Sequence, residues 1–185
     1  MHRYMRLRKQ LMGLDELHFY DIYTALLPDV DVNIPYEDAK KTVTEALTCL
    51  GKEYGDLLNQ GFTNRWIDVY ETKNKRSGAY CCGSAYWTTP YVLLNHKNTY
   101  DGTLDSQFTL AHEMGHALHS YLSNHTQPTI YQDYVIFVAE VASTCNEALL
   151  MQHLLKQTTD KRQRAYLINY FLEQFRTTLY RQTMF

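Results

Sequence analysis

The stretch TLAHEMGHAL at residues 109–118 contains an H-E-x-x-H motif formed by His112, Glu113 and His116. In a helix, His112 and His116 lie one turn apart on the same face, so both imidazoles can bind one zinc ion. Glu113 lies beside them and can act as a general base on an attacking water. The alternative is a chance match on an ordinary amphipathic helix, so the motif needs support from the rest of the chain.

The composition is that of a soluble globular protein, with 185 residues, 45% hydrophobic and 21% charged. The net charge of −2 indicates neither a nucleic acid nor a membrane surface as a partner. We find no apolar run long enough to cross a membrane and no signal peptide at residues 1–6. The spacing of the four cysteines matches neither a zinc site nor a disulfide framework: Cys49, Cys81, Cys82 and Cys145. We therefore expect reduced thiols, which favour a cytoplasmic location.

Hydrophobic periodicity divides the chain into four parts. Residues 1–65 are expected to be helical, 66–96 to form a small sheet, 101–156 to hold the zinc-site helices, and 160–185 to form a last helix. Apolar spacing predicts one helix over 1–27 and helix over 36–58, where Gly51, Gly55 and Gly61 mark breaks or ends. It predicts strands at 66–70, 79–82 and 91–95. The predicted fold is mainly α with a small antiparallel sheet (α+β).

The helix that carries the motif is expected to run from about residue 104 to 122, with Thr103 or Asp101 as its N-cap. Gly115 within this helix lowers the stability of the helix by roughly 1 kcal/mol relative to alanine. A position without a side chain beside a metal would let another element pack closely, which gives this cost a use.

Glu140 is the strongest candidate for a third metal ligand. His119 lies roughly 10 Å along the helix from His112, too far to share one ion with it. Glu140 stands in the apolar run 135–142, where we expect a buried carboxylate that needs a metal or a cation. The alternative is a buried salt bridge, although no basic residue lies within one turn. Glu147, two turns later, could hydrogen-bond a ligand histidine.

The chain resembles the oligoendopeptidase F family, the bacterial branch related to thimet oligopeptidase and neurolysin. The resemblance rests on the runs at 78–80, 91–95, 108–116 and 137–144. It implies a zincin-like catalytic region of a mostly helical metallopeptidase that cleaves short peptides. It also implies one Zn²⁺ per chain on His112, His116 and Glu140, with Glu113 as general base.

Members of that family are much longer, and they carry a C-terminal region whose His and Tyr residues bind substrate and stabilise the oxyanion. No such segment follows the zinc helices here, and the last helix shows no stop signal before residue 185. We therefore expect a fragment of a catalytic region that needs the remainder of the full-length peptidase. A catalytically incomplete fragment that only binds zinc or peptide is the main alternative.

The predicted substrate is an oligopeptide held as an added strand along the sheet edge at Gly78, Ala79 and Tyr80. A plain structural hairpin is an equally good interpretation of these residues. A structural helical domain with a chance motif is a further alternative. An aminopeptidase is disfavoured, because no motif supplies an acidic group for the free N-terminus.

Overall fold

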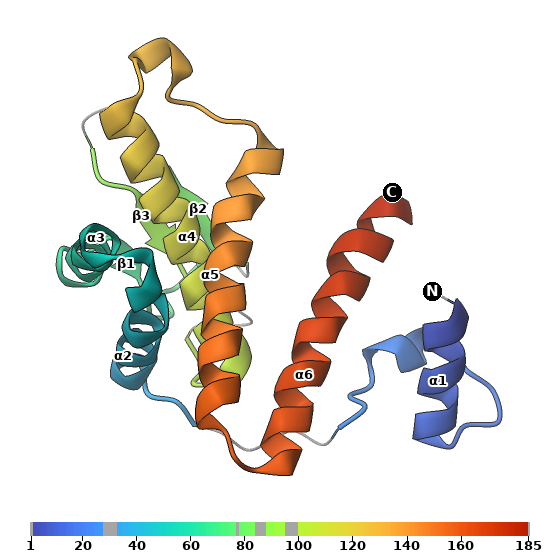
Figure 1. Cartoon of the computed structure of the whole chain (residues 1–185). Helices are drawn as coiled ribbons and strands as arrows, with labels where there is room; N and C mark the ends of the chain where they lie inside the picture. The colour runs from blue at the N-terminus through green and yellow to red at the C-terminus, as the bar shows by residue number, and fades with distance from the viewer. Residues whose placement is uncertain (1, 28–32, 77, 84–87, 95–99, 185) are drawn as a thin grey trace. The chain divides into compact units, whose positions relative to one another are not determined.

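Figure 1 shows the computed structural model, which describes residues 2–27, 33–76, 78–83, 88–94 and 100–184. It is mostly helical, as the sequence predicts. The chain forms two compact units, one of Val32–Leu154 and the other of Met1–Asp31 with Leu155–Phe185. The H-E-x-x-H motif lies in the first of these units. Residues 28–35, whose two prolines and alternating Asp and Val predict an extended linker, fall largely outside the described residues.

Two short helices open the Val32–Leu154 unit: α2 (Tyr36–Ala46), which continues into the 3₁₀ turn η2 (Leu47–Leu50), and α3 (Lys52–Thr63). The sequence predicts helix over residues 36–58 with a break or an end at Gly51, and the structure has a break there, since Gly51 has a φ of +94° and separates α3 from η2. Only glycine adopts such a backbone conformation at little cost. The helix therefore breaks where the chain must turn to bring a second apolar face, including Leu58, into the core.

The sheet has three short strands, β1 (Ile67–Asp68), β2 (Tyr80–Cys82) and β3 (Tyr91–Leu93), in the order β1-β3-β2. β2 pairs antiparallel with β3, as expected, but β1 pairs parallel with β3. The sheet is therefore mixed rather than mainly antiparallel. Alternating side chains identify a strand but not the direction of its partner, and β1 is followed by a long connection rather than a tight hairpin. In the part of the chain that the structure describes, β2 lies at an edge.

Two long helices follow the sheet, α4 (Leu104–Thr126) and α5 (Ile136–Gln157). Thr103 is the N-cap of α4, because its side chain accepts a hydrogen bond from the backbone N–H of Ser106. α4 continues to Thr126, one turn beyond the predicted end, and the connection to α5 contains the 3₁₀ turn η3 (Thr129–Tyr131). The largest fully buried side chains include Trp66, Phe108, Leu110, Met114, Leu118 and Leu150. The motif helix therefore runs through the core.

Gly115 lets α4 and α5 approach closely. A Cβ at this position would lie 2.7 Å from the Cα of Ser143 and 2.9 Å from the carbonyl oxygen of Ala142. The buried Asn146 secures the same contact, because its Nδ2 donates to the carbonyl of Ala111 at 3.1 Å. The use that the sequence suggests for Gly115 is confirmed: the absent side chain allows a second helix to pack beside the motif.

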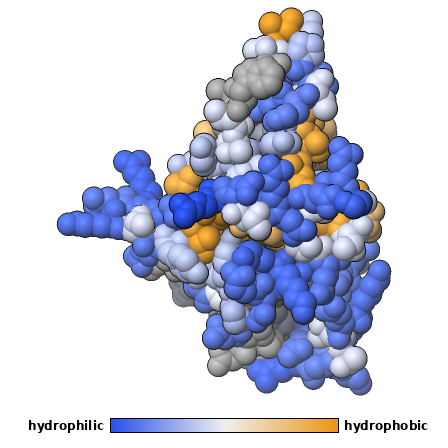
Figure 2. All heavy atoms as spheres, turned by 90° about the vertical axis from the view of Figure 1, so that its left-hand side faces the viewer, coloured by the Kyte–Doolittle hydropathy of each residue, from blue (hydrophilic) through white to orange (hydrophobic). Residues whose placement is uncertain are grey.

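The face of the molecule in Figure 2 is mainly hydrophilic, and hydrophobic side chains appear on it only in smaller patches. The hydrophobic residues of α2 point inward, since Ala39, Val43 and Ala46 are all buried. No helix of the described residues has the length and hydrophobicity needed to span a lipid bilayer.

The second unit contains α1 (His2–Met12), the 3₁₀ turn η1 (Phe19–Tyr23), α6 (Lys161–Phe175), the π-helical turn η4 (Arg176–Tyr180) and η5 (Gln182–Met184). The continuous helix predicted over 1–27 is wrong, because α1 ends at Met12 and Gly13 adopts a φ of +65°. Arg8 is buried and donates to the carbonyl of Asp21, and it lies 3.8 Å from the carboxylate of Glu173. A buried guanidinium thus connects α1, η1 and α6.

We predict that Gly115→Ala lowers the free energy of unfolding by about 1–3 kcal/mol, because the added methyl meets the backbone of α5. This loss exceeds the gain of about 1 kcal/mol in helix propensity. Gly55→Ala in α3 is the matched control, since nothing lies within 4 Å of its added Cβ, and it should be neutral or stabilising. Urea denaturation measures both, and equal stability of the two variants would contradict the proposed helix contact.

Candidate active site

His112 and His116 face each other from successive turns of α4, as the motif predicts. Their Nε2 atoms are 3.1 Å apart, and Oε2 of Glu140 on α5 lies 3.5 Å from Nε2 of His112 and 3.7 Å from Nε2 of His116. Tetrahedral zinc with bonds of ~2.1 Å would place its ligand atoms about 3.4 Å apart. The three separations bracket this value, so two imidazoles and one carboxylate form a donor set that fits a zinc ion.

Glu140 reaches this position without the burial that the sequence suggests. Its side chain is 48% exposed, and its neighbours Phe137, Val138 and Val141 are exposed as well. The expectation of a buried carboxylate is wrong, because the apolar run lies on the surface of the described residues. The carboxylate is instead held by Ser143, whose hydroxyl donates to Oε2 at 3.0 Å.

Glu147 contacts His112 from behind. Its Oε1 lies 2.6 Å from Nδ1 of His112, which leaves Nε2 of the same ring directed at His116 and Glu140. Burial alone would lower the pKa of His112, but the hydrogen bond and the charge of Glu147, together with Glu113 and Glu140, raise it. For His116, burial and the neighbouring His112 lower the pKa. Glu147 therefore orients one imidazole and increases its basicity.

Glu113 lies on the same turn but has a different environment. Its side chain is 6% exposed, and its Oε2 has no hydrogen-bond partner among the described residues. Burial raises the pKa of Glu113 to about 7, against the attraction of His112 and with a further rise from Glu140 and Glu147. A carboxylate with a pKa near neutrality is well suited to accept a proton and to return it.

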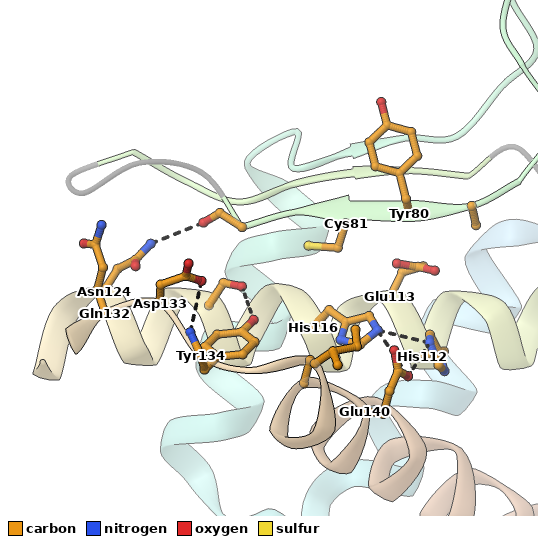
Figure 3. Close-up of a pocket in the computed structure, with 15 residues that line it drawn as sticks. Tyr80, Cys81, His112, Glu113, His116, Asn124, Gln132, Asp133, Tyr134 and Glu140 are labelled. Carbon is orange, nitrogen blue, oxygen red and sulfur yellow. Dashed lines mark hydrogen bonds and ion pairs between the residues drawn. The ribbon is translucent and has the colours of Figure 1, made fainter. Parts of the chain in front are cut away.

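A cleft of about 790 Å³ opens above these residues, between β2 and the N-terminal part of α5 (Figure 3). Its floor is a row of side chains on α4 spaced by four residues: His112, His116, Ser120 and Asn124. Its other lining residues include Ala79, Cys81, Gly83, Gln132, Asp133, Tyr134, Ile136 and Ala139. The metal-site residues thus lie in one part of a longer groove.

The sequence-predicted substrate residues lie at this groove in different ways. Ala79 and Tyr80 line it, whereas Gly78 is not among its lining residues. Figure 3 shows the Tyr80 side chain on the side of β2 that faces away from α4, and the Cys81 side chain on the side that faces α4. Tyr80 can therefore present only its main chain, since alternate residues of a strand face opposite sides.

Cys81, Ser120, Asn124 and Tyr134 are cleft residues that the sequence does not single out. Ser120 and Asn124 continue the four-residue spacing of the motif histidines, a signal that could have identified them. The Tyr134 hydroxyl lies 2.5 Å from that of Ser120. Burial raises the pKa of Cys81 to about 12, so its thiol is protonated at neutral pH. No comparable pattern indicates Cys81 or Tyr134, because their positions depend on how β2 and α5 pack.

The model of peptidase family M3 matches residues 1–185. The chain belongs to peptidase family M3. It is 51% identical over its whole length to oligopeptidase PepF of Bacillus subtilis (strain 168), of which it covers 27%. It is 45% identical to group B oligopeptidase PepB of Streptococcus agalactiae, of which it covers 30%. This M3 chain thus spans less than a third of the curated relatives it matches.

Solved structures agree with the assignment to family M3. A peptidase from Chlamydophila abortus has a TM-score of 0.81 at 40% identity, over 98% of this chain and 29% of its own. Oligoendopeptidase-F from Enterococcus faecium has a TM-score of 0.60 at 33% identity, over 98% of this chain and 23% of its own. The predicted resemblance to oligoendopeptidase F is confirmed, and with it the mostly helical fold class.

We predict that the protein binds one zinc ion per chain and that His112→Ala and His116→Ala each abolish stoichiometric binding, since each removes one of three donors. Equilibrium dialysis against Zn²⁺ measures this. His125→Ala is the matched control, because this exposed histidine lies on α4 outside the cleft and should leave binding unchanged. Full binding by either motif variant would contradict the site.

We predict that Glu147→Gln weakens zinc binding by about 10–100-fold without abolishing it. The amide keeps the size of the side chain but loses the charge that orients and polarises His112. A competition titration with a chelator of known affinity measures the change. An affinity equal to that of the parent would show that the contact with Glu147 is only structural.

Proposed function

We propose that this chain forms the metal-binding part of the active site of a zinc-dependent endopeptidase that hydrolyses short oligopeptides. The observation that carries the proposal is the triangle of His112, His116 and Glu140 donor atoms, open to a cleft and flanked by the buried Glu113. The membership of family M3 and the names of the relatives, oligopeptidase and oligoendopeptidase, support peptide hydrolysis.

When bound at these three side chains, zinc supplies Lewis acidity to the scissile carbonyl and lowers the pKa of the attacking water. Glu113 accepts the proton of that water as the water attacks the carbonyl carbon, then transfers the proton to the departing amine. Both steps need a carboxyl group that changes protonation state near neutral pH. Burial raises the pKa of the Glu113 carboxyl above its usual range, which favours uptake of the proton.

The edge of β2 is proposed to hold the substrate. Its outer side has no paired strand among the described residues, and its main chain runs above the donor triangle (Figure 3). An extended peptide added there makes main-chain hydrogen bonds that do not depend on its side chains. Binding of this kind suits an enzyme that cleaves varied peptides, with Ala79 and Tyr80 contributing backbone rather than side-chain contacts.

The groups that complete the transition state are proposed to lie in sequence that the relatives have and this chain does not include. In the described residues, no Arg or Lys lines the cleft to stabilise an oxyanion. Loss of an oxyanion donor typically costs about 10²–10³ in rate. The remaining length of an M3 peptidase would supply those donors. The four free thiols suit a reducing compartment, so we also propose a cytoplasmic location.

We predict that Glu113→Gln in the full-length polypeptide lowers kcat by about 10²–10⁴-fold while zinc content is retained, because only proton transfer is lost. Cleavage of a fluorogenic peptide and metal analysis of the same sample measure both quantities. Glu53→Gln, an exposed position on α3, is the control and should keep full activity. A Glu113→Gln variant as active as the parent would contradict the general-base role. Zinc binding without cleavage by the 185-residue chain alone would support the incomplete binding fragment instead.

A further inference from the structure

Asp133 lies in the candidate active-site cleft, away from the metal-site residues. It is exposed, it lines the cleft, and Figure 3 places it near Asn124 and Gln132, at the opposite end from His112. The carbonyl of Gln132 accepts a hydrogen bond from the Ser123 hydroxyl at 2.7 Å, which fixes this segment beside the last turns of α4. A carboxylate therefore stands within the groove but outside the donor triangle.

The surroundings hold Asp133 in place. Its Oδ1 accepts from the backbone N–H of Tyr134 at 3.0 Å. The Tyr134 ring stacks on His119 with ring centroids 3.9 Å apart, and its hydroxyl contacts Ser120. The position of the Asp133 carboxylate is thus coupled to α4 through the ring stack and the hydroxyl contact of Tyr134. Asp133 is therefore part of a defined surface rather than of a free loop.

Helix geometry gives the distance from the metal site. Ser123 lies about 13 Å along α4 from the midpoint of His112 and His116, at ~1.5 Å per residue. An extended peptide advances ~3.3 Å per residue. Ser120, which contacts the Tyr134 hydroxyl, lies about 9 Å along α4 from the same midpoint, at ~1.5 Å per residue. Asp133 lies between Gln132 and Tyr134 in the chain, so it stands about three to four substrate residues from the bond that the metal site would cleave.

The direction of β2 indicates which end of a substrate reaches Asp133. The carbonyl of Gly83, directly after β2, accepts from Nδ2 of Asn124 at 3.2 Å, so the C-terminal end of β2 lies at the Asn124 end of the groove. β2 already pairs antiparallel with β3, and antiparallel pairs are the commoner kind. A peptide added antiparallel to β2 has its N-terminal side at Asn124 and Asp133.

The charges agree with that direction. The acidic residues that line the cleft are Glu113, Glu140 and Asp133, and no Lys or Arg lines it in the part of the chain that the structure describes. We propose that Asp133 anchors the α-ammonium group of the peptide about three to four residues before the scissile bond. This inference rests on the proposed function and adds a substrate preference to it. The endopeptidase would prefer to cleave at a set number of residues from the free N-terminus of its substrate.

The test compares two fluorogenic peptides that differ only in N-acetylation, each with four residues before the cleaved bond. The full-length polypeptide loaded with zinc should show a kcat/KM about 1.5- to fivefold higher for the free amine, as for an exposed ion pair. Asp133→Asn, which keeps the Oδ1 acceptor, should bring this ratio close to one. Asp56→Asn on α3, outside this cleft, is the matched control and should retain the ratio of the parent.

A second pair of peptides is N-acetylated in both members, and the first residue is lysine in one and norleucine in the other. This pair separates recognition of an α-ammonium from recognition of a side-chain ammonium. Raising the ionic strength to about 1 M should shrink the ratio, because screening shortens the range of the attraction to about 3 Å. A ratio near one in the parent, or one that Asp133→Asn leaves unchanged, overturns the anchor while cleavage itself upholds the proposed function. Failure of the zinc-loaded parent to cleave any of these peptides overturns both.

Discussion

The close contact between α4 and α5 at Gly115 is the constraint on which the rest of the site depends. Two histidines one turn apart make only a pair of donors, and the carboxylate that completes the set comes from a different helix. Glu140 reaches the pair because the backbone of Ser143 packs directly against the position where a Cβ of residue 115 would stand. Gly115 thus lowers the helix propensity of α4, but it allows Glu140 to reach the two histidines.

The same packing creates two carboxylates with different environments on either side of His112. Glu147 lies behind the ring and binds Nδ1, so it holds the imidazole with Nε2 toward the cleft. Glu113 lies nearby with one oxygen buried and without a partner among the described residues, and its pKa is raised to about 7. One carboxylate fixes the orientation of an imidazole, and the other is the one that we propose as the general base. The spacing of residues along α4 does not by itself reveal these two environments.

Several features of the fold could not be predicted, each for an identifiable reason. The parallel pairing of β1 with β3 depends on the path of the chain between them, which strand periodicity does not encode. The end of α1 at Met12 is followed by Gly13 with a φ of +65°, a backbone conformation that a glycine permits but does not require. The exposure of the run around Glu140 reverses an expectation from composition, because hydrophobicity predicts burial only where another part of the chain covers the residues.

By itself, the sequence determined the mostly helical class, the motif helix with its cap at Thr103 or Asp101, and the pairing of His112 with His116, since these follow from local spacing of about one helical turn. The sequence also matches the model of peptidase family M3 over residues 1–185. Only the tertiary structure decided the groove: the place of β2 above α4, the inward direction of Cys81, and the position of Tyr134 and Asp133 beside the row that the histidines begin. The physical reason is that helix spacing is a local property, whereas a cleft exists only where separate elements pack.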